Sequence, residues 1–167
     1  MNDIDSVNGL IEAMSSELAT LVADNGCDNP AMVGIHTGGV WVAGELHRKL
    51  GIMDPLGSLD IAFYRDDFTR IGMNPVVKPS QLPFGIDNRH IILVDDVLHT
   101  GRTIRAAMNE LFDYGRPASI MLATLVERDG RELPIQANVV GRHVQLDPDQ
   151  HIKLSGPDPL QLEIKQI

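Results

Sequence analysis

The residues best suited to chemistry in this sequence are two adjacent aspartates, Asp95 and Asp96, in the stretch HIILVDDVLHTGRTIRAAMNEL. They follow the apolar run of residues 91–94 and precede small hydroxyl residues, a glycine and a helical pattern. Two neighbouring carboxylates at the end of a buried strand are costly unless they bind something, because burial and like charge both disfavour ionised acids. The hydroxyl groups of a sugar, bound directly or through Mg²⁺, are suitable partners.

The loop that follows the two acids has the composition of a phosphate-binding site, with a helix expected from about Thr103. Backbone N–H groups at the start of a helix favour an anion, and the helix dipole adds to their effect. Thr100 and Thr103 supply hydroxyl groups, and Gly101 lets the backbone approach a ligand closely. The acids and the loop together predict a site for a ribose phosphate.

Two simpler interpretations stay open at this point. Asp95 and Asp96 could cap the helix that follows, as acids often do. The combination of apolar strand, paired acids, hydroxyl-bearing loop and helix favours a ligand site over capping. Arg102 could bind a phosphate, or it could be an ordinary surface arginine in solvent.

Alternating strand and helix patterns place these residues at one edge of a sheet. Apolar runs predict strands over residues 31–36, 58–64, 91–94 and 118–126. Three-and-four spacing with glycine stops predicts helices over residues 7–22, 40–51 and 103–115. This order is typical of an α/β fold with a doubly wound parallel sheet, whose ligands bind at the carboxyl ends of the strands. The irregular interval 65–85 is long enough to be functional.

Composition limits the classes of protein to consider. The chain has 167 residues, 43% of them hydrophobic, which suits a single domain over residues 1–167. It carries 14 Lys and Arg against 23 Asp and Glu, a formal charge of −9, and no basic residue precedes Arg48. This balance disfavours a general nucleic-acid binder, because non-specific affinity comes from neutralised phosphates.

The expected compartment is the cytoplasm. No apolar run is long enough to span a bilayer, and the first residues, MNDIDSVNGLIEAM, lack the basic flank and apolar segment of a secretory signal. Cys27 is the single cysteine and builds no disulfide framework. We therefore expect no membrane partner.

Several segments resemble a known family. IILVDDVLHTGRT is similar to the phosphoribosyl diphosphate (PRPP) signature of type I phosphoribosyltransferases. LDIAFYRDDF, FDYGRPASI and LVERDGRELPI resemble the PyrR family of pyrimidine operon regulators and uracil phosphoribosyltransferases, over about residues 33–141. The resemblance implies the type I phosphoribosyltransferase fold, a central parallel sheet flanked by helices, with a small hood or cap mainly from about residues 127–167.

The resemblance also implies roles for individual residues. Asp95 and Asp96 would hold the ribose hydroxyls and, with them, Mg²⁺. The residues implied in PRPP binding are Thr37, Gly38, Gly39, Asp95, Asp96, Val97, Leu98, His99, Thr100, Gly101, Arg102 and Thr103. The expected catalytic residues are Asp95, Asp96 and Arg65, the last within a mobile loop that begins at residues 64–67. The base would lie near Glu127, Arg128 and Arg131.

The implied activity is a pentosyl transfer, uracil plus PRPP giving UMP and diphosphate with Mg²⁺, joined to regulation of pyrimidine biosynthesis. The developing oxocarbenium charge calls for nearby carboxylates, and cations would neutralise the leaving group. Family members form dimers or larger assemblies, so a homo-oligomer, a dimer or a tetramer, is expected. The alternative is a catalytically weak sensor of PRPP or a nucleotide that acts through RNA or a protein partner.

The sequence departs from the family pattern at Gly38. Many members carry Thr-Arg-Gly in the pyrophosphate loop, and this chain has Thr37-Gly38-Gly39. A charge-assisted hydrogen bond is worth roughly 1.5 to 3 kcal/mol, so a lost arginine corresponds to about ten- to a hundredfold in binding or rate. Either the activity is weakened, or Gly38 only shapes the turn and Arg65 or Lys78 supplies the charge.

Binding of messenger RNA is the second activity known in the family. Members that do so use a basic dimer face and residues of the first helix, whereas here that helix is acidic. RNA therefore remains possible as a partner but is disfavoured. The basic side chains that could form a patch are expected to be solvated surface charges; they are Arg105, Arg116, Arg142 and Lys153.

Overall fold

The computed structural model describes residues 6–61 and 80–167. The described helices are α1 (Val7–Asp24), α2 (Gly38–Leu50) and α4 (Arg102–Tyr114). The described strands are β1 (Ala31–Ile35), β2 (Gly57–Leu59), β3 (His90–Leu98), β4 (Ser119–Arg128), β5 (Val139–Val144), β6 (Gln150–Ser155) and β7 (Gln161–Gln166). Residues 62–64 of the expected second strand and residues 65–79 of the expected loop lie outside the described residues.

The central sheet has five parallel strands in the order β2-β1-β3-β4-β5. All of β1 and most of the first half of β3 are buried, which explains why both read as continuous apolar runs in the sequence. The register pairs Met32 with Ile92 and Gly34 with Val94, so the carboxyl end of β1 lies beside β3 just before Asp95. This confirms the expected α/β fold with a parallel sheet.

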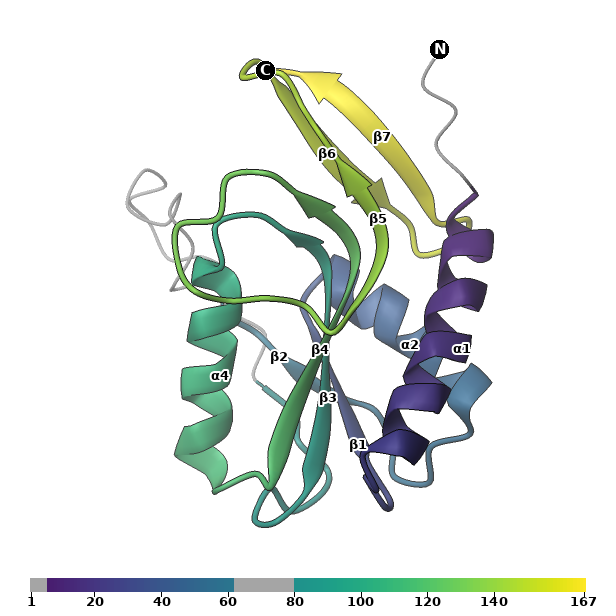
Figure 1. Ribbon diagram of the computed structural model, residues 1–167, viewed down its shortest axis with the longest axis vertical. Helices are drawn as coiled ribbons and strands as arrows, with labels where there is room; N and C mark the ends of the chain where they lie inside the picture. Colours follow the sequence, from purple (N-terminus) through teal and green to yellow (C-terminus); the bar gives the residue numbers. More distant parts are fainter. Residues whose placement is uncertain (1–5, 62–79) are drawn as a thin grey trace.

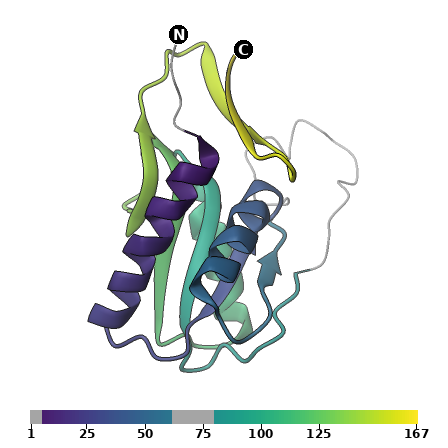
Figure 2. The ribbon, with the colours of Figure 1, turned by 90° about the vertical axis from the view of Figure 1, so that its right-hand side faces the viewer.

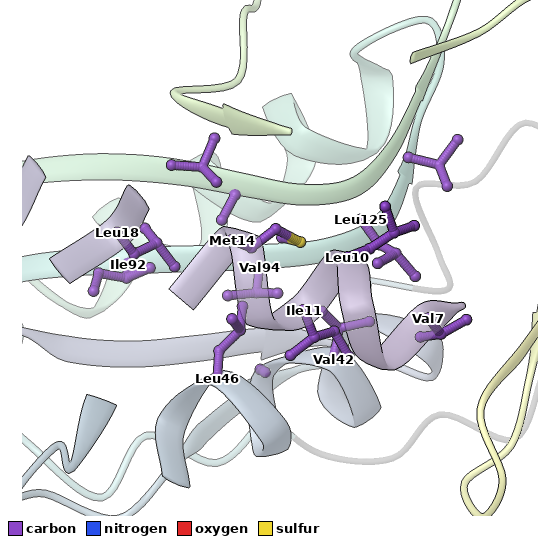
Figure 3. Close-up of a cluster of buried hydrophobic side chains, with 14 of the residues drawn as sticks. Val7, Leu10, Ile11, Met14, Leu18, Val42, Leu46, Ile92, Val94 and Leu125 are labelled. Atoms are coloured by element: carbon purple, nitrogen blue, oxygen red, sulfur yellow. The ribbon is translucent and has the colours of Figure 1, made fainter. Parts of the chain in front are cut away.

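Helices cover both faces of the sheet (Figures 1 and 2). Helices α1 and α2 lie on one face, where their apolar side chains point toward those of β3 and β4 in Figure 3. Helix α4 covers the other face, where Ile104 and Leu111 pack against Ile91 and Leu93. The strands contribute side chains to the cores on both faces, because neighbouring side chains along a strand point to opposite faces.

The apolar face of α1 is used for folding. Leu10, Ile11, Met14 and Leu18 are each at most 6% exposed and belong to the core between α1 and the sheet. The helix begins after Ser6, whose side chain accepts a hydrogen bond from the backbone N–H of Gly9 at 3.1 Å. Such a cap is worth about 1 kcal/mol. The expected amphipathic helix is therefore confirmed, and its apolar face is already covered within one chain.

The expected end of the third strand needs correction. β3 continues through Leu98, so Asp95 and Asp96 are strand residues and do not begin a loop. The pairing of β3 with β4 runs on to Leu98 opposite Glu127, and these ladder hydrogen bonds hold the acids in extended backbone. The hydrophobic pattern ends at residue 94 because the last part of the strand faces a ligand-sized pocket and solvent.

The C-terminal stretch forms one strand of the central sheet and a separate hairpin. β5 forms the edge of the central sheet beside β4, and β6 and β7 form a separate antiparallel hairpin. The hairpin rises beyond the carboxyl ends of the central strands in Figure 1. Within residues 6–61 and 80–167, no helix has the length and apolar character required to cross a membrane.

Candidate active site

A pocket of about 380 Å³ opens where the order of the sheet reverses, at the carboxyl ends of β1 and β3. Open parallel sheets bind ligands at this switch point, because the two flanking connections leave the sheet in opposite directions there. The pocket is lined by Thr37, Gly38, Trp41, Asp95, Asp96, Val97, Thr103, Ile152, Lys153 and Leu154. The structure thus joins the expected diphosphate loop, the paired acids and the start of α4 in one site.

The two acids are held by the backbone at the end of β3. Asp95 is only 5% exposed, and its Oδ1 accepts a hydrogen bond of 2.9 Å from the N–H of Asp96. Asp96 in turn accepts a hydrogen bond of 2.9 Å at Oδ1 from the N–H of Val97. Neither acid caps α4, which begins after Gly101 and has no side-chain cap. The capping interpretation is therefore wrong.

Gly39 and Gly38 allow α2 to begin directly against the acids. A Cβ on Gly39 would lie 2.7 Å from the carbonyl oxygen of Val94 and 3.0 Å from the Cα of Asp95. A Cβ on Gly38 would lie 2.7 Å from Cγ of Asp96 and closer still to its Oδ2. At position 39 the close atoms belong to the backbone, so space requires glycine there, whereas at position 38 the space is occupied by the side chain of Asp96.

The loop between β3 and α4 is held by hydrogen bonds of Thr100 and by a positive φ at Gly101. The Thr100 hydroxyl accepts a hydrogen bond of 3.2 Å from the N–H of Arg102, and Gly101 adopts φ = 94°, which only glycine enters readily. The Thr100 carbonyl accepts hydrogen bonds from the N–H groups of Glu132 (2.9 Å) and Leu133 (3.1 Å). The segment after β4 therefore fixes the loop, and the N-terminus of α4 is directed to the pocket through Thr103.

Arg102 lies outside the pocket lining. Its Nη2 is 3.4 Å from Oε2 of Glu132, and the two side chains are 44% and 51% exposed. An exposed pair of this kind contributes little to stability, because water screens both charges. The geometry matches the interpretation of Arg102 as a surface arginine.

Glu127 and Arg131 form an ordered network beside the loop. Arg131 pairs with Oε1 of Glu127, and it donates hydrogen bonds to the carbonyl oxygens of Ile135 (2.7 Å) and His99 (2.5 Å). Oε2 of Glu127 lies 3.2 Å from Nδ1 of His143. Neither Glu127 nor Arg131 lines the 380 Å³ pocket, so the structure places these expected base-binding residues next to it rather than in it.

Arg128 and His99 complete this neighbourhood. The Nε of Arg128 is buried and has no hydrogen-bond partner among the described residues. His99 lies against Gly130, where a Cβ would approach its Nε2 to 2.8 Å. Desolvation lowers the pKa of His99, and the positive charges of Arg128 and Arg131 lower it further against the opposing charge of Glu132. His99 is therefore biased toward its neutral form.

The hairpin contributes residues that sequence reasoning missed. Ile152, Lys153 and Leu154 of β6 line the pocket, as does Trp41 of α2. Lys153 and Arg116 were expected to be solvated surface charges and not a patch. Arg116 follows α4 near the amino ends of the strands, where its backbone meets Asn88 and the Asp87 carboxylate. Lys153 and Arg116 therefore do not form one patch. Only the alternation of Ile152 and Leu154 around Lys153 in the sequence hinted at a strand with one polar face.

Other expected residues lie outside the described residues. They are Tyr64, Arg65, Asp66, Asp67 and Lys78.

The donor set of the pocket fits Mg²⁺ bound together with a substrate. No group of three or more His, Cys, Asp or Glu suited to a metal occurs among residues 6–61 and 80–167. Mg²⁺ usually keeps several waters and binds through one or two carboxylates plus substrate phosphates. Asp95 and Asp96 provide such carboxylates, and no all-protein cage is required.

Known proteins resemble this chain in sequence and in fold. The phosphoribosyl transferase domain family model matches residues 6–153. A protein of Nitrosococcus oceani named bifunctional protein PyrR is 61% identical over 164 residues, which cover 97% of this chain and 93% of that protein. A protein of the same name from Pseudomonas aeruginosa is 57% identical over 158 residues, which cover 95% of this chain and 93% of that protein.

Solved structures support the fold alone. A hypoxanthine-guanine phosphoribosyltransferase from Bacillus anthracis has a TM-score of 0.70 at 18% identity. The superposition covers 91% of this chain and 86% of that enzyme's chain. A hypoxanthine phosphoribosyl transferase from Trypanosoma cruzi has a TM-score of 0.66 at 20% identity, covering 86% and 76% of the two chains. With the type I fold and the sequence relatives in agreement, the chain belongs to the phosphoribosyltransferase family and, within it, to the PyrR group.

Proposed function

We propose that this protein transfers the phosphoribosyl group of PRPP to uracil, giving UMP and diphosphate, and that it takes part in regulating pyrimidine biosynthesis. One observation carries the proposal. Thr37 and Gly38, Asp95 and Asp96, and Thr103 come from three separate segments and line one pocket at the switch point of the sheet. Family membership adds that the transferred group is a phosphoribosyl group.

In the proposed reaction the bond from uracil N1 to the anomeric carbon forms as the bond from that carbon to the diphosphate oxygen breaks. The diphosphate leaves with the electron pair, and the N1 proton passes to solvent. Asp95 and Asp96 hold the ribose hydroxyls and stabilise positive charge that develops on the ring. The N-terminus of α4 with Thr103 binds the 5′-phosphate, because its N–H groups and dipole favour an anion.

Mg²⁺ is the proposed cofactor. Asp95 and Asp96 would hold it together with the ribose and diphosphate oxygens, and when bound it neutralises charge on the leaving group. The partners we propose are PRPP, uracil and UMP, with a second copy of the chain in a dimer or a tetramer. The cytoplasm is the proposed compartment, because a single cysteine builds no disulfide framework.

A regulatory sensor of low turnover is the second candidate, and a specific observation supports it. Gly38 cannot be replaced by the usual arginine while Asp96 keeps its position. The relatives carry the name bifunctional protein, which indicates a second activity in them. We favour a nucleotide or PRPP signal passed to a protein partner over RNA, because α1 presents Glu12 and Glu17 and carries no basic residue.

UMP formation from labelled uracil and PRPP, with and without Mg²⁺, tests the proposal. We expect turnover by the parent protein and a loss of about tenfold or more in Asp96→Asn, because the substitution removes a charged hydrogen-bond acceptor from the ribose. Asp54→Asn is the matched control, since Asp54 pairs with Arg89 outside the pocket. No UMP from the parent despite measurable PRPP binding would refute the enzyme and leave the sensor.

A further inference from the structure

The charge of the pocket does not suit its proposed ligand unless a cation takes part. Its lining carries two carboxylates, and PRPP brings a 5′-phosphate and a diphosphate. Like charges at close range oppose binding and are only partly offset by the dipole of α4. Among the described residues that line the pocket, Lys153 is the single side chain with a positive charge.

The position of Lys153 is fixed by its neighbours on β6. Ile152 and Leu154 are 8% and 4% exposed and belong to the core that also contains α1 and α2. Neighbouring residues of a strand point to opposite sides, so Lys153 projects away from this core. The anchored strand therefore sets where the lysine stem begins, while its flexible end can reach an anion.

The hairpin is also held against the helix that begins at the diphosphate loop. A Cβ on Gly156 would lie 3.1 Å from the ring of Trp41, which shows how closely the end of β6 approaches α2. Trp41 stands one turn after Gly38 and lines the same pocket as Lys153. Lys153 and the first turn of α2 thus line one pocket.

The Lys153 ammonium is not engaged elsewhere in the described part of the chain. Glu163 faces Lys153 across the hairpin, but its carboxylate pairs with Lys165 at 3.3 Å. No hydrogen bond or ion pair joins Lys153 to another described residue. An ammonium in this state can bind a phosphate without first breaking an existing pair.

From these observations we propose that Lys153 binds the diphosphate of PRPP and supplies the positive charge that position 38 cannot carry. The inference rests on the proposed function. Lys153 stays protonated throughout: it donates hydrogen bonds to the diphosphate oxygens and stabilises the charge that they gain as the bond to the anomeric carbon breaks. The C-terminal hairpin is then part of the catalytic site and not only a cover.

Lys153→Met tests the proposal, because methionine keeps much of the apolar stem and removes the charge. Lys49→Met on α2 is the matched control, because Lys49 pairs with Glu12 outside the pocket. Lys153→Arg restores a cation. Three quantities are measured: the affinity for PRPP, the affinity for inorganic diphosphate alone, and the separate KM values for PRPP and uracil. Melting temperatures check that each variant is folded.

We expect Lys153→Met to weaken diphosphate and PRPP binding by about ten- to a hundredfold, the range of one charge-assisted hydrogen bond. The KM for uracil should stay within about twofold, and Lys153→Arg should recover most of the affinity, because a structural role would not restore diphosphate binding selectively. The inference would be overturned by an unchanged diphosphate affinity in a folded Lys153→Met, or by an equal reduction in Lys49→Met.

The two proposals fail in different ways. If the parent protein makes no UMP but Lys153→Met still loses diphosphate affinity, the lysine site stands and the uracil transferase does not. If the parent makes UMP and Lys153→Met makes it with an unchanged KM for PRPP, the transferase stands and the lysine site does not.

Discussion

Replacing Gly38 by alanine adds one methyl group where Asp96 already lies. The new Cβ would sit 2.7 Å from Cγ and 3.0 Å from Cβ of Asp96, whereas ordinary contacts begin at 3.4 Å. Because α2 starts at this residue and β3 is paired with β4 on both sides of Asp96 along the strand, neither backbone can retreat easily. The Asp96 side chain must rotate, which breaks its 2.9 Å hydrogen bond from the N–H of Val97.

The cost can be divided between stability and binding. Forcing a methyl group into a filled space costs about 1 to 3 kcal/mol. A displaced carboxylate loses its hydrogen bonds to the ribose, worth roughly 1.5 to 3 kcal/mol, or about ten- to a hundredfold in PRPP affinity or kcat/KM. We therefore expect Gly38→Ala to melt at a lower temperature than the parent and to bind PRPP at least about tenfold more weakly.

Gly44→Ala is the matched control because it lies in the same helix and nothing is within 4 Å of its added Cβ. Alanine in a helix interior stabilises by about 0.5 to 1 kcal/mol relative to glycine, so this variant should melt slightly higher and keep its PRPP affinity. Calorimetry and titration with PRPP provide both readouts. In an Asp96→Ala background the stability cost of Gly38→Ala should shrink, since Cγ and both oxygens are gone. The reasoning would be refuted if Gly38→Ala had the same PRPP affinity and the same melting temperature as Gly44→Ala.

Two further predictions concern stability. Burial and neighbouring arginines lower the pKa of His99 in the folded protein below the ordinary 6.5. At a pH between the folded and the unfolded pKa, the unfolded chain binds more protons than the folded one. The free energy of unfolding therefore falls as the pH falls through this range. His99→Gln should lose less stability than the parent between neutral and mildly acidic pH in urea titrations; an equal loss would contradict the assignment. Leu46→Ala, at a side chain with 0% exposure, should lower the free energy of unfolding by about 2 to 5 kcal/mol. Met53→Ala, at a side chain 88% exposed, should change it by less than about 0.5 kcal/mol, and similar losses in the two variants would contradict the observed core.

The sheet and its helices were predictable because their signals are local. The continuous apolar run before Asp95 indicates a strand buried on both faces, and the spacing from Leu10 to Leu18 indicates one helix face. Gly51 ends α2 in the left-handed conformation, φ = 62°, as a glycine after a periodic segment suggests. What the pattern did not show is that β3 continues through the acids, because pairing with β4 rather than hydrophobicity maintains the strand there.

The site was predictable only where it is built from contiguous segments. The acids and the helix start at Thr103 follow one another in the chain, so their chemistry could be inferred together. Lys153 lies far from them in sequence and reaches the pocket through a hairpin whose strand pairing no local pattern specifies. Glu127 and Arg131 were expected near the base, but their mutual ion pair was not predictable, since it depends on how the segment after β4 folds back onto the loop at Thr100.

The absence of arginine at position 38 and the presence of Lys153 in the pocket have one physical explanation. In this chain Asp96 is turned toward α2 and fills the volume that a side chain at position 38 would need. On the proposed function, a cation for the diphosphate would come from an element that does not pass through that volume. The hairpin reaches the pocket from beyond the carboxyl ends of the strands (Figure 1). Because the hairpin is anchored through Ile152 and Leu154, the lysine can act at a distance from the loop without adding bulk beside Asp96. The close packing of Gly38 against Asp96 and the charge of Lys153 are therefore parts of a single arrangement. We expect a substitution at either residue to weaken diphosphate binding.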